Sequence, residues 1–190
     1  MSLLTTSAVR ARAQKSVSYN FSAANVLTER MQKQAASVGH DIFLSHAFDD
    51  KELILGVALT LEDLGYTIYL DWRDDPSLDR KNVNHATALK LRERMQNSKC
   101  LFFATTENTS NSKWMPWELG FKDGISGRSA ILPLQATRPD DYKGQEYLGI
   151  YPYITQQQSQ DGQEKLWVRR SRTCYVVFEE WLAGKEPYER

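Results

Sequence analysis

The sequence predicts an α/β fold in which a mostly parallel, five-stranded sheet lies between two layers of helices. Through residues 41–182, short apolar runs alternate with segments whose apolar residues recur at helical spacing. This alternation is typical of parallel strands joined by right-handed crossovers, which place helices on both faces of a sheet. Gly65 ends the first helical segment where a C′ glycine belongs, and an apolar run follows at once.

Five apolar runs predict the strands. The expected strands cover residues 41–45, 66–71, 100–104, 130–134 and 151–154. Pro152 restricts the last of them to an edge or a terminus, because proline lacks the N–H that a central strand donates.

Helical spacing predicts the elements between the strands. The expected helices cover residues 22–37, 49–64, 84–97 and 175–182, and a further helix begins near Pro116. Residues 72–82 and 156–164 are expected to be loops, and the charges of the first predict that it is exposed.

The chain divides into three predicted segments. Residues 41–183 are expected to form the main domain, 1–40 an N-terminal arm followed by a helix, and 184–190 a C-terminal tail. Residues 1–20 have no clear period, so a mobile arm is expected there. Their basic, acid-poor character also resembles a transit peptide.

Composition argues against several classes of partner. The chain has 190 residues, 41% of them hydrophobic, which suffices for one domain with an appendage. A formal net charge of zero gives no reason to expect nucleic-acid binding. No apolar run approaches the ~20 residues needed to cross a bilayer. No membrane association is therefore expected, and a cytoplasmic location is predicted.

Cys100 and Cys174 lie in apolar stretches and are expected to be reduced. The three histidines lack metal-ligand spacing, so no metal site is predicted.

The segment Trp114–Glu118 carries the strongest functional signal. It places a carboxylate beside one indole and four residues after another, near the start of a helix that follows a predicted strand. Ligands of open α/β sheets bind at the carboxyl ends of the strands. Aromatic faces at that edge suit a flat ring or a sugar. The alternative is that both Trp side chains belong to the core and that Glu118 only complements the helix dipole.

Other polar and aromatic side chains follow the predicted strands at the same edge. Because the carboxyl ends of parallel strands converge, we expect them to share one cleft with Glu118. The candidates are Ser45, His46 and Phe48 after the first strand, Trp72 and Arg73 after the second, and Trp114 after the third.

Three of these segments together resemble a Toll/interleukin-1 receptor (TIR) domain of the bacterial kind. Residues 41–46 (Asp-Ile-Phe-Leu-Ser-His) are similar to the first box of the family, residues 65–71 to its second strand, and residues 112–119 to its Ser-x-Trp-x-x-x-Glu-Leu element. The resemblance covers residues 41–182 and implies a flavodoxin-like three-layer sandwich. The loop after the second strand departs from the family at residues 79–84, and residues 1–40 have no counterpart in it.

The resemblance implies an enzyme that cleaves the nicotinamide–ribose bond of NAD, with Glu118 as the catalytic residue. It also implies a Thoeris-like role in antiphage defence, in which the enzyme makes an ADP-ribose-derived signalling nucleotide or depletes NAD. The expected substrate-binding residues are Ser45, His46, Phe48, Trp72, Arg73 and Trp114. No cofactor is expected, since NAD is the substrate. The implied partners are a separate effector protein that senses the product and further copies of this chain, which would associate through residues 72–82.

Two other functions stay open. Many TIR domains are adaptors that only associate with one another, and Glu118 would then be structural. A deoxyribosyltransferase would also use a related sheet and a glutamate. Individual residues have plainer alternatives as well: Ser45 as a turn residue, His46 as a loop residue and Arg73 in an ion pair with Asp74 or Asp75.

Overall fold

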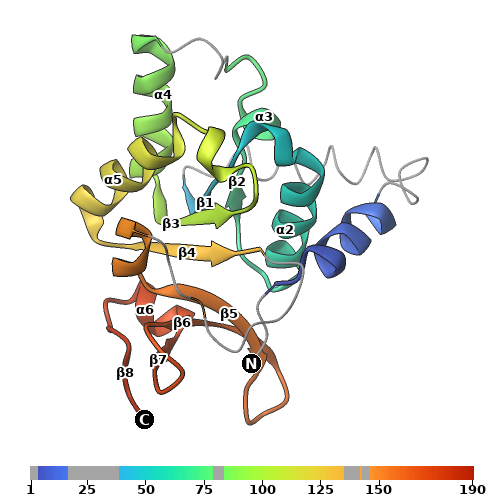
Figure 1. The fold of residues 1–190 in the computed structure, drawn as a ribbon, viewed down its shortest axis with the longest axis vertical. Coiled ribbons are helices and arrows are strands. Elements are labelled where there is room, and N and C mark those ends of the chain that lie inside the picture. The colour runs from blue at the N-terminus through green and yellow to red at the C-terminus, as the bar shows by residue number, and fades with distance from the viewer. Residues whose placement is uncertain (1–3, 17–38, 79–83, 135–141, 143–145) are drawn as a thin grey trace.

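The computed structural model describes residues 4–16, 39–78, 84–134, 142 and 146–190. Within these residues the strands form one eight-stranded sheet with the order β2-β1-β3-β4-β5-β6-β7-β8 (Figure 1). The first five strands in this order follow the 2-1-3-4-5 arrangement of flavodoxin-like folds. The predicted three-layer α/β architecture is confirmed, and the sheet is larger than predicted.

The parallel half of the sheet contains the strands that were predicted. It consists of β1 (His40–Ser45), β2 (Ile68–Tyr69), β3 (Ser98–Thr105), β4 (Ser129–Pro133) and the start of β5 (Tyr153–Gln158). In the register between β1 and β3, Ser45 lies opposite Phe103. Thr105 in turn lies opposite Pro133 of β4, so the carboxyl ends of three strands meet at one edge.

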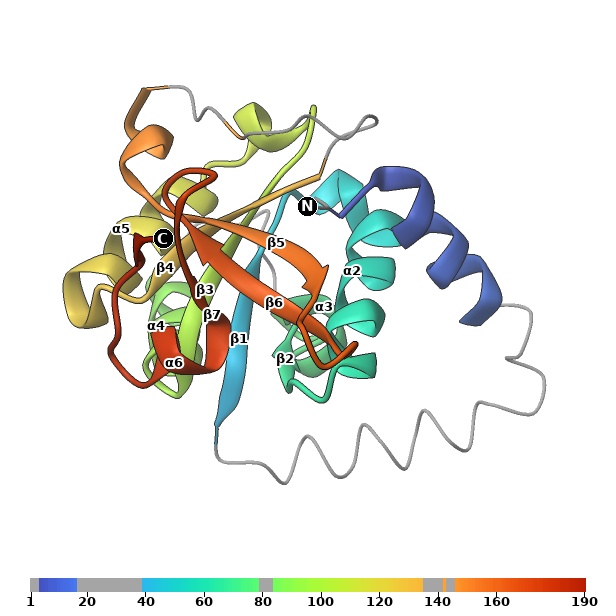
Figure 2. The same cartoon turned by 90° about the horizontal axis from the view of Figure 1, so that it is seen from below.

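Helices cover both faces of the sheet (Figures 1 and 2). On one face lie α4 (His85–Gln96) and α5 (Met115–Ser126), and on the other lie α2 (Lys51–Asp63), α6 (Phe178–Leu182) and a helix over residues 6–16. Short elements connect them: α3 (Asp71–Asp74) and the 3₁₀ turns η1 (Phe48–Asp50), η2 (Thr109–Asn111) and η3 (Glu146–Ile150). None of the helices in the described part of the chain is long and apolar enough to cross a membrane.

Side-chain alternation along the strands divides the core in two. Ile42 and Leu44 of β1 pack in the cluster under α2 and α6, whereas Phe43 packs in the cluster under α4 and α5. Ser45 follows the same period of two and therefore faces α5. The direction of its side chain is a direct consequence of the strand geometry.

The local signals at helix ends are largely as predicted. Gly65 follows the end of α2 with φ +94°, the left-handed conformation that glycine adopts without strain. Asn84 caps α4, because its Oδ1 accepts the N–H of Thr87 at 2.9 Å. Pro116 occupies the first turn of α5.

The carboxyl-terminal third differs from the prediction. The predicted loop over 156–164 is instead an antiparallel hairpin in which β5 pairs with β6 (Glu164–Arg169). The predicted helix over 175–182 is wrong in its first turn, because Tyr175 lies in β7 (Cys174–Val177) and α6 begins at Phe178. Of the two positions predicted for the strand at Pro152, an edge or a terminus, the second is found: β5 pairs with both β4 and β6, and Pro152 lies just before its first residue. The last strand, β8 (Tyr188–Glu189), pairs with β7.

The amino-terminal segment also differs. A mobile arm was expected over residues 1–20, but residues 6–16 form a helix that lies beside α2 in both views (Figures 1 and 2). Leu4 and Val9 belong to the core cluster under α2, and Arg12 forms a bidentate ion pair with Asp63 at 2.6 and 2.9 Å. The helix predicted over 22–37 lies outside the described residues.

Gly56 provides a test of this packing. A Cβ built at Gly56 would lie 1.9 Å from the carbonyl oxygen of Val9, so a methyl group there has to displace the amino-terminal helix. We expect Gly56→Ala to lower the free energy of unfolding by about 1–3 kcal/mol, as overpacking does. Urea denaturation measures this difference.

Gly124 of α5 is the matched control, because a Cβ built there has no atom within 4 Å. Gly124→Ala should raise stability by about 0.5–1 kcal/mol, since alanine loses less backbone entropy in a helix. Equal stability of the wild type and Gly56→Ala would contradict the close contact.

Candidate active site

A cavity opens at the carboxyl edge of the parallel strands. It has a volume of about 1070 Å³ and is lined by the end of β3, the loop that follows it, Leu134 after β4 and the turn η3. Ser112 and Pro116, which flank the start of α5, belong to the wall. The cavity therefore lies where an open α/β sheet binds its ligands, and it exceeds the roughly 300–1,000 Å³ of most ligand pockets.

Glu118 and Ser45 meet at this edge. The hydroxyl of Ser45 donates a hydrogen bond of 2.5 Å to Oε2 of Glu118, and both residues are fully buried. The backbone N–H of Glu118 bonds to the carbonyl of Trp114 at 2.8 Å, which fixes the residue in the first turn of α5. Two residues 73 positions apart are thus joined by a hydrogen bond, which holds the carboxyl group in one orientation.

His46 is held as a neutral ring. Its Nδ1 lies 2.8 Å from the carbonyl oxygen of Leu44, which only accepts, and its Nε2 lies 3.1 Å from Nε1 of Trp72, which only donates. Nδ1 therefore carries the proton and Nε2 accepts. Nε2 also lies 3.5 Å from Oδ1 of Asp71. Since the lone pair of Nε2 is engaged by Trp72, this geometry favours a role for His46 in orienting the indole over a role as a general base.

Phe48 and Trp72 both lie near the ammonium group of one lysine. Nζ of Lys51 is 4.1 Å from the centre of the Phe48 ring and 5.9 Å from that of Trp72. Phe48 is 47% exposed, so it belongs to the surface and not to the core. The structure brings these two predicted aromatic residues together through a cation–π contact.

Trp114 packs mainly against protein. It is 8% exposed, belongs to the core cluster under α4 and α5, and meets Trp117 edge to face with ring centres 5.4 Å apart. Its backbone turns the chain into α5. These contacts match the alternative in which this indole is a core residue.

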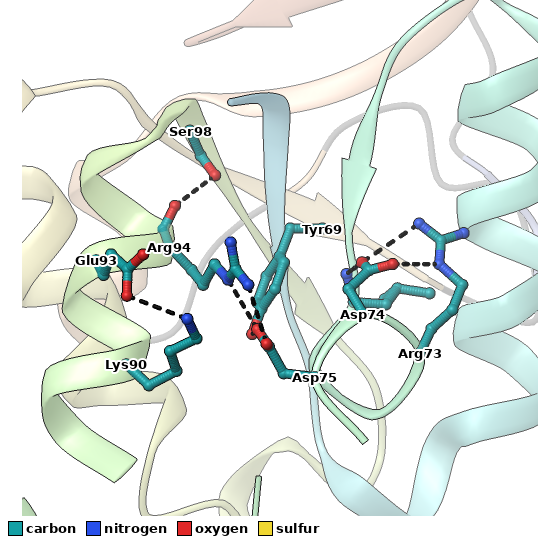
Figure 3. A network of polar contacts seen from close by, with 9 residues as sticks. Tyr69, Arg73, Asp74, Asp75, Lys90, Glu93, Arg94 and Ser98 are labelled. Atoms are coloured by element: carbon teal, nitrogen blue, oxygen red, sulfur yellow. Dashed lines mark hydrogen bonds and ion pairs between the residues drawn. The ribbon is translucent and has the colours of Figure 1, made fainter. Parts of the chain in front are cut away.

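Arg73 forms its described polar contacts with residues outside the candidate set. Its guanidinium donates to Glu62 at 2.6 Å, to Asp74 at 3.1 Å and to the carbonyl of Ile68. Figure 3 shows the predicted ion pair with Asp74, and it is largely buried, because the side chains of Arg73 and Asp74 are 8% and 16% exposed. Its described contacts include none of the other candidate site residues.

The segment after β2 is therefore tied down as far as Asp75. Arg94 of α4 forms a bidentate pair with Asp75 at 2.7 and 2.9 Å, and the hydroxyl of Tyr69 donates to the same carboxylate (Figure 3). Burial alone would raise the pKa of Asp75, but the bonds from Arg94 and Tyr69 hold that pKa below its ordinary value. The expectation of an exposed charged loop is wrong for residues 72–75, which are partly buried.

Asp50 and Lys122 also position the site, although the sequence analysis did not name them as candidates. Asp50 accepts from the hydroxyl of Thr106 at 2.5 Å and from the amide of Asn108 at 2.7 Å, so it anchors the loop after β3. Lys122 is buried, which lowers its pKa, and it donates to the carbonyls of Met95 and Ser98. It locks α5 against α4. No spacing pattern in the sequence marks Asp50 or Lys122, because the residues that each contacts are distant in sequence.

Comparison with known proteins identifies the family. The chain is 47% identical over 171 residues to the probable 3′ cyclic ADP-D-ribose synthase ThsB′ of Bacillus cereus (strain MSX-D12), which covers 87% of this chain and 89% of that protein. It is 32% identical over 83 residues to the putative cyclic ADP-D-ribose synthase TIR2 of Cytobacillus dafuensis, which covers 43% of this chain and 22% of that protein. No protein-family model matches the chain. The resemblance inferred from the motifs is confirmed, and the chain belongs to the bacterial TIR-domain family that includes ThsB′.

Proposed function

We propose that this chain cleaves the nicotinamide–ribose bond of NAD and closes the remaining ADP-ribose into a cyclic signalling nucleotide. The name of the relative that matches along nearly its full length, a probable 3′ cyclic ADP-D-ribose synthase, supports the cyclic product. NAD is the substrate in this reaction and no further cofactor is required.

One carboxylate is sufficient for this chemistry. Ordinary glycosidases use two, one of which protonates the leaving group. The nicotinamide of NAD is already a cation and leaves as a neutral molecule, so no general acid is needed. The ribose then carries oxocarbenium-like positive charge, and the negative charge of Glu118 stabilises it electrostatically. Attack by the adenosine half of the same molecule closes the ring, whereas attack by water would give ADP-ribose.

The observation that carries the proposal is the hydrogen bond of 2.5 Å from Ser45 to a fully buried Glu118. A buried charge costs several kcal/mol of desolvation, so a carboxylate retained there needs oriented partners. Ser45 is one of them, and it fixes one oxygen so that the other has a defined direction. Such preorganisation is what electrostatic catalysis requires.

Access to Glu118 depends on movement. The carboxylate is covered by protein, so contact with a ribose requires neighbouring side chains to shift when substrate binds. This requirement fits an enzyme with low basal activity that self-association activates. We propose that copies associate through residues 72–82. Because Arg73, Asp74 and Asp75 are paired within the chain, the contact would rest on the later residues of that segment.

The cellular role follows from the same reaction. A diffusible cyclic nucleotide requires a separate effector protein that senses it, and NAD is available in the cytoplasm, where we place this protein. We assign the pathway to antiviral defence. The rival function, an adaptor without catalysis, is separated from this proposal by the following experiment.

Substitution of the carboxylate tests the catalytic role. We expect Glu118→Gln to reduce nicotinamide release from NAD at least about 100-fold, because the variant keeps the shape and loses the charge that stabilises the transition state. Mass spectrometry of the products measures the loss. Glu93→Gln is the control, since Glu93 is exposed and pairs only locally with Lys90 in Figure 3. A folded Glu118→Gln protein with undiminished turnover would refute the assignment, and an adaptor would have no activity to lose.

Removal of the Ser45 hydroxyl tests the orientation of Glu118. A hydrogen bond to a charged group contributes about 1.5–3 kcal/mol, so Ser45→Ala should lower kcat roughly 10-fold or more with less change in KM. Steady-state kinetics on NAD separate the two constants. Ser129→Ala is the matched control, because this buried serine of β4 has no hydrogen-bond partner for its hydroxyl among the described residues. Equal losses in both variants would point to a general effect of buried serines.

Protein concentration tests the proposed self-association. Specific activity should rise with concentration, and it should fall with added salt if charges mediate the contact, since salt screens exposed charges within about 10 Å at 0.1 M. Activity assays paired with analytical ultracentrifugation in the presence of NAD provide the measurement. Constant specific activity from a protein that sediments as a monomer throughout would exclude activation by assembly and leave the cleavage mechanism intact.

A further inference from the structure

The cavity at the carboxyl edge has one wall outside the segment that resembles a TIR domain. Thr6 and Arg10 of the amino-terminal helix line it, together with Leu53 of α2 and Phe103 of β3. Leu53 and Phe103 belong to core clusters on opposite faces of the sheet. The cavity therefore extends around the sheet edge, from the layer of α5 to the layer of α2 and the amino-terminal helix.

This cavity reaches the neighbourhood of Glu118. Phe103 lies opposite Ser45 in the parallel register of β1 and β3, and Ser45 holds the carboxylate of Glu118. A dinucleotide with its reacting ribose near Glu118 would extend along the cavity toward the amino-terminal helix. The volume of about 1070 Å³ has room for such a molecule.

The helix that carries Arg10 is held in place. Val9 and Ala13 are buried on the inner side of the helix, and the backbone of Val9 rests against Gly56. The ion pair between Arg12 and Asp63 secures the same helix to α2. Arg10 lies about 100° around the helix from Val9, so its side chain is exposed at the wall of the cavity while its backbone is fixed.

Arg10 differs in the sign of its charge from the other charged residues that line the cavity. Three acidic residues line the wall, Asp50, Glu107 and Glu146, and Arg10 is the only basic residue among the described lining residues. The carboxylate of Asp50 is already bonded to Thr106 and Asn108. An anionic diphosphate entering this acidic cavity needs a cation, and the guanidinium fork suits two phosphate oxygens at once.

We propose that Arg10 binds the diphosphate of the dinucleotide substrate, so that the amino-terminal helix completes the substrate site. The inference rests on the proposed cleavage of NAD, since it names the group that holds the non-reacting part of that substrate. The helix then contributes to substrate binding as well as to the packing of the fold. Arg10 sets affinity and position, and it takes no part in bond cleavage.

Binding of ADP-ribose tests this proposal without turnover. In a Glu118→Gln background, Arg10→Ala should weaken ADP-ribose binding roughly 10- to 100-fold, the range expected for hydrogen bonds to a charged group. The ADP-ribose affinity of Arg10→Lys should lie between those of the parent protein and Arg10→Ala, because lysine supplies the charge without the guanidinium fork. Lys15→Ala is the control, since Lys15 is exposed on the same helix and does not line the cavity. Isothermal titration calorimetry gives the affinities, and thermal unfolding should be unchanged in all of them.

Kinetics on NAD with Glu118 intact give the second readout. Arg10→Ala should raise KM by a similar factor and leave kcat nearly unchanged, which a merely structural role would not produce. Unaltered ADP-ribose affinity in Arg10→Ala, or no ADP-ribose binding by the parent protein, would overturn the proposal. Arg10-dependent ADP-ribose binding by a protein that never releases nicotinamide would instead refute the proposed function and retain the phosphate assignment.

Discussion

The parallel register between β1 and β3 is the constraint on which the site depends. Because side chains alternate along a strand, this register places Ser45 opposite Phe103 and on the face covered by α5. A slip of one residue would turn Ser45 toward α2 and break its hydrogen bond to the carboxyl group of Glu118. The apolar residues of β1 prevent such a slip, since Ile42 and Leu44 would then move from one core to the other.

Partly buried acidic residues hold the two segments that follow β2 and β3. Asp50 anchors the loop after β3 through Thr106 and Asn108, while Asp75 fastens the segment after β2 to Arg94 and Tyr69. Each carboxylate is satisfied by at least two donors, which offsets the cost of removing it from water. The loop after β3, which lines the cavity, is thereby fixed by polar contacts to η1, and the segment after β2 is fixed to α4 and β2.

The amino-terminal helix adds a wall to the cavity at the edge of the sheet. Its attachment needs a glycine at position 56, because the Val9 carbonyl lies where a side chain would be. That close approach replaces solvent with backbone and buries Leu4 and Val9 in the existing core. The helix is thus joined to α2 by packing and by the ion pair with Asp63.

The sequence by itself determined the parallel half of the sheet, most of its helices, the left-handed glycine after α2 and the family. These depend on local periodicity and on motifs that are contiguous in the chain. The meeting of Ser45 with Glu118, the neutral ring of His46 between Leu44 and Trp72, and the buried pairing of Arg73 were decided by the tertiary structure. The strand identity of Tyr175 was decided in the same way, because β6 supplies its partner. The physical reason is that hydrogen bonds and strand pairing join residues far apart in sequence, and composition or spacing carries no record of which distant group will lie opposite.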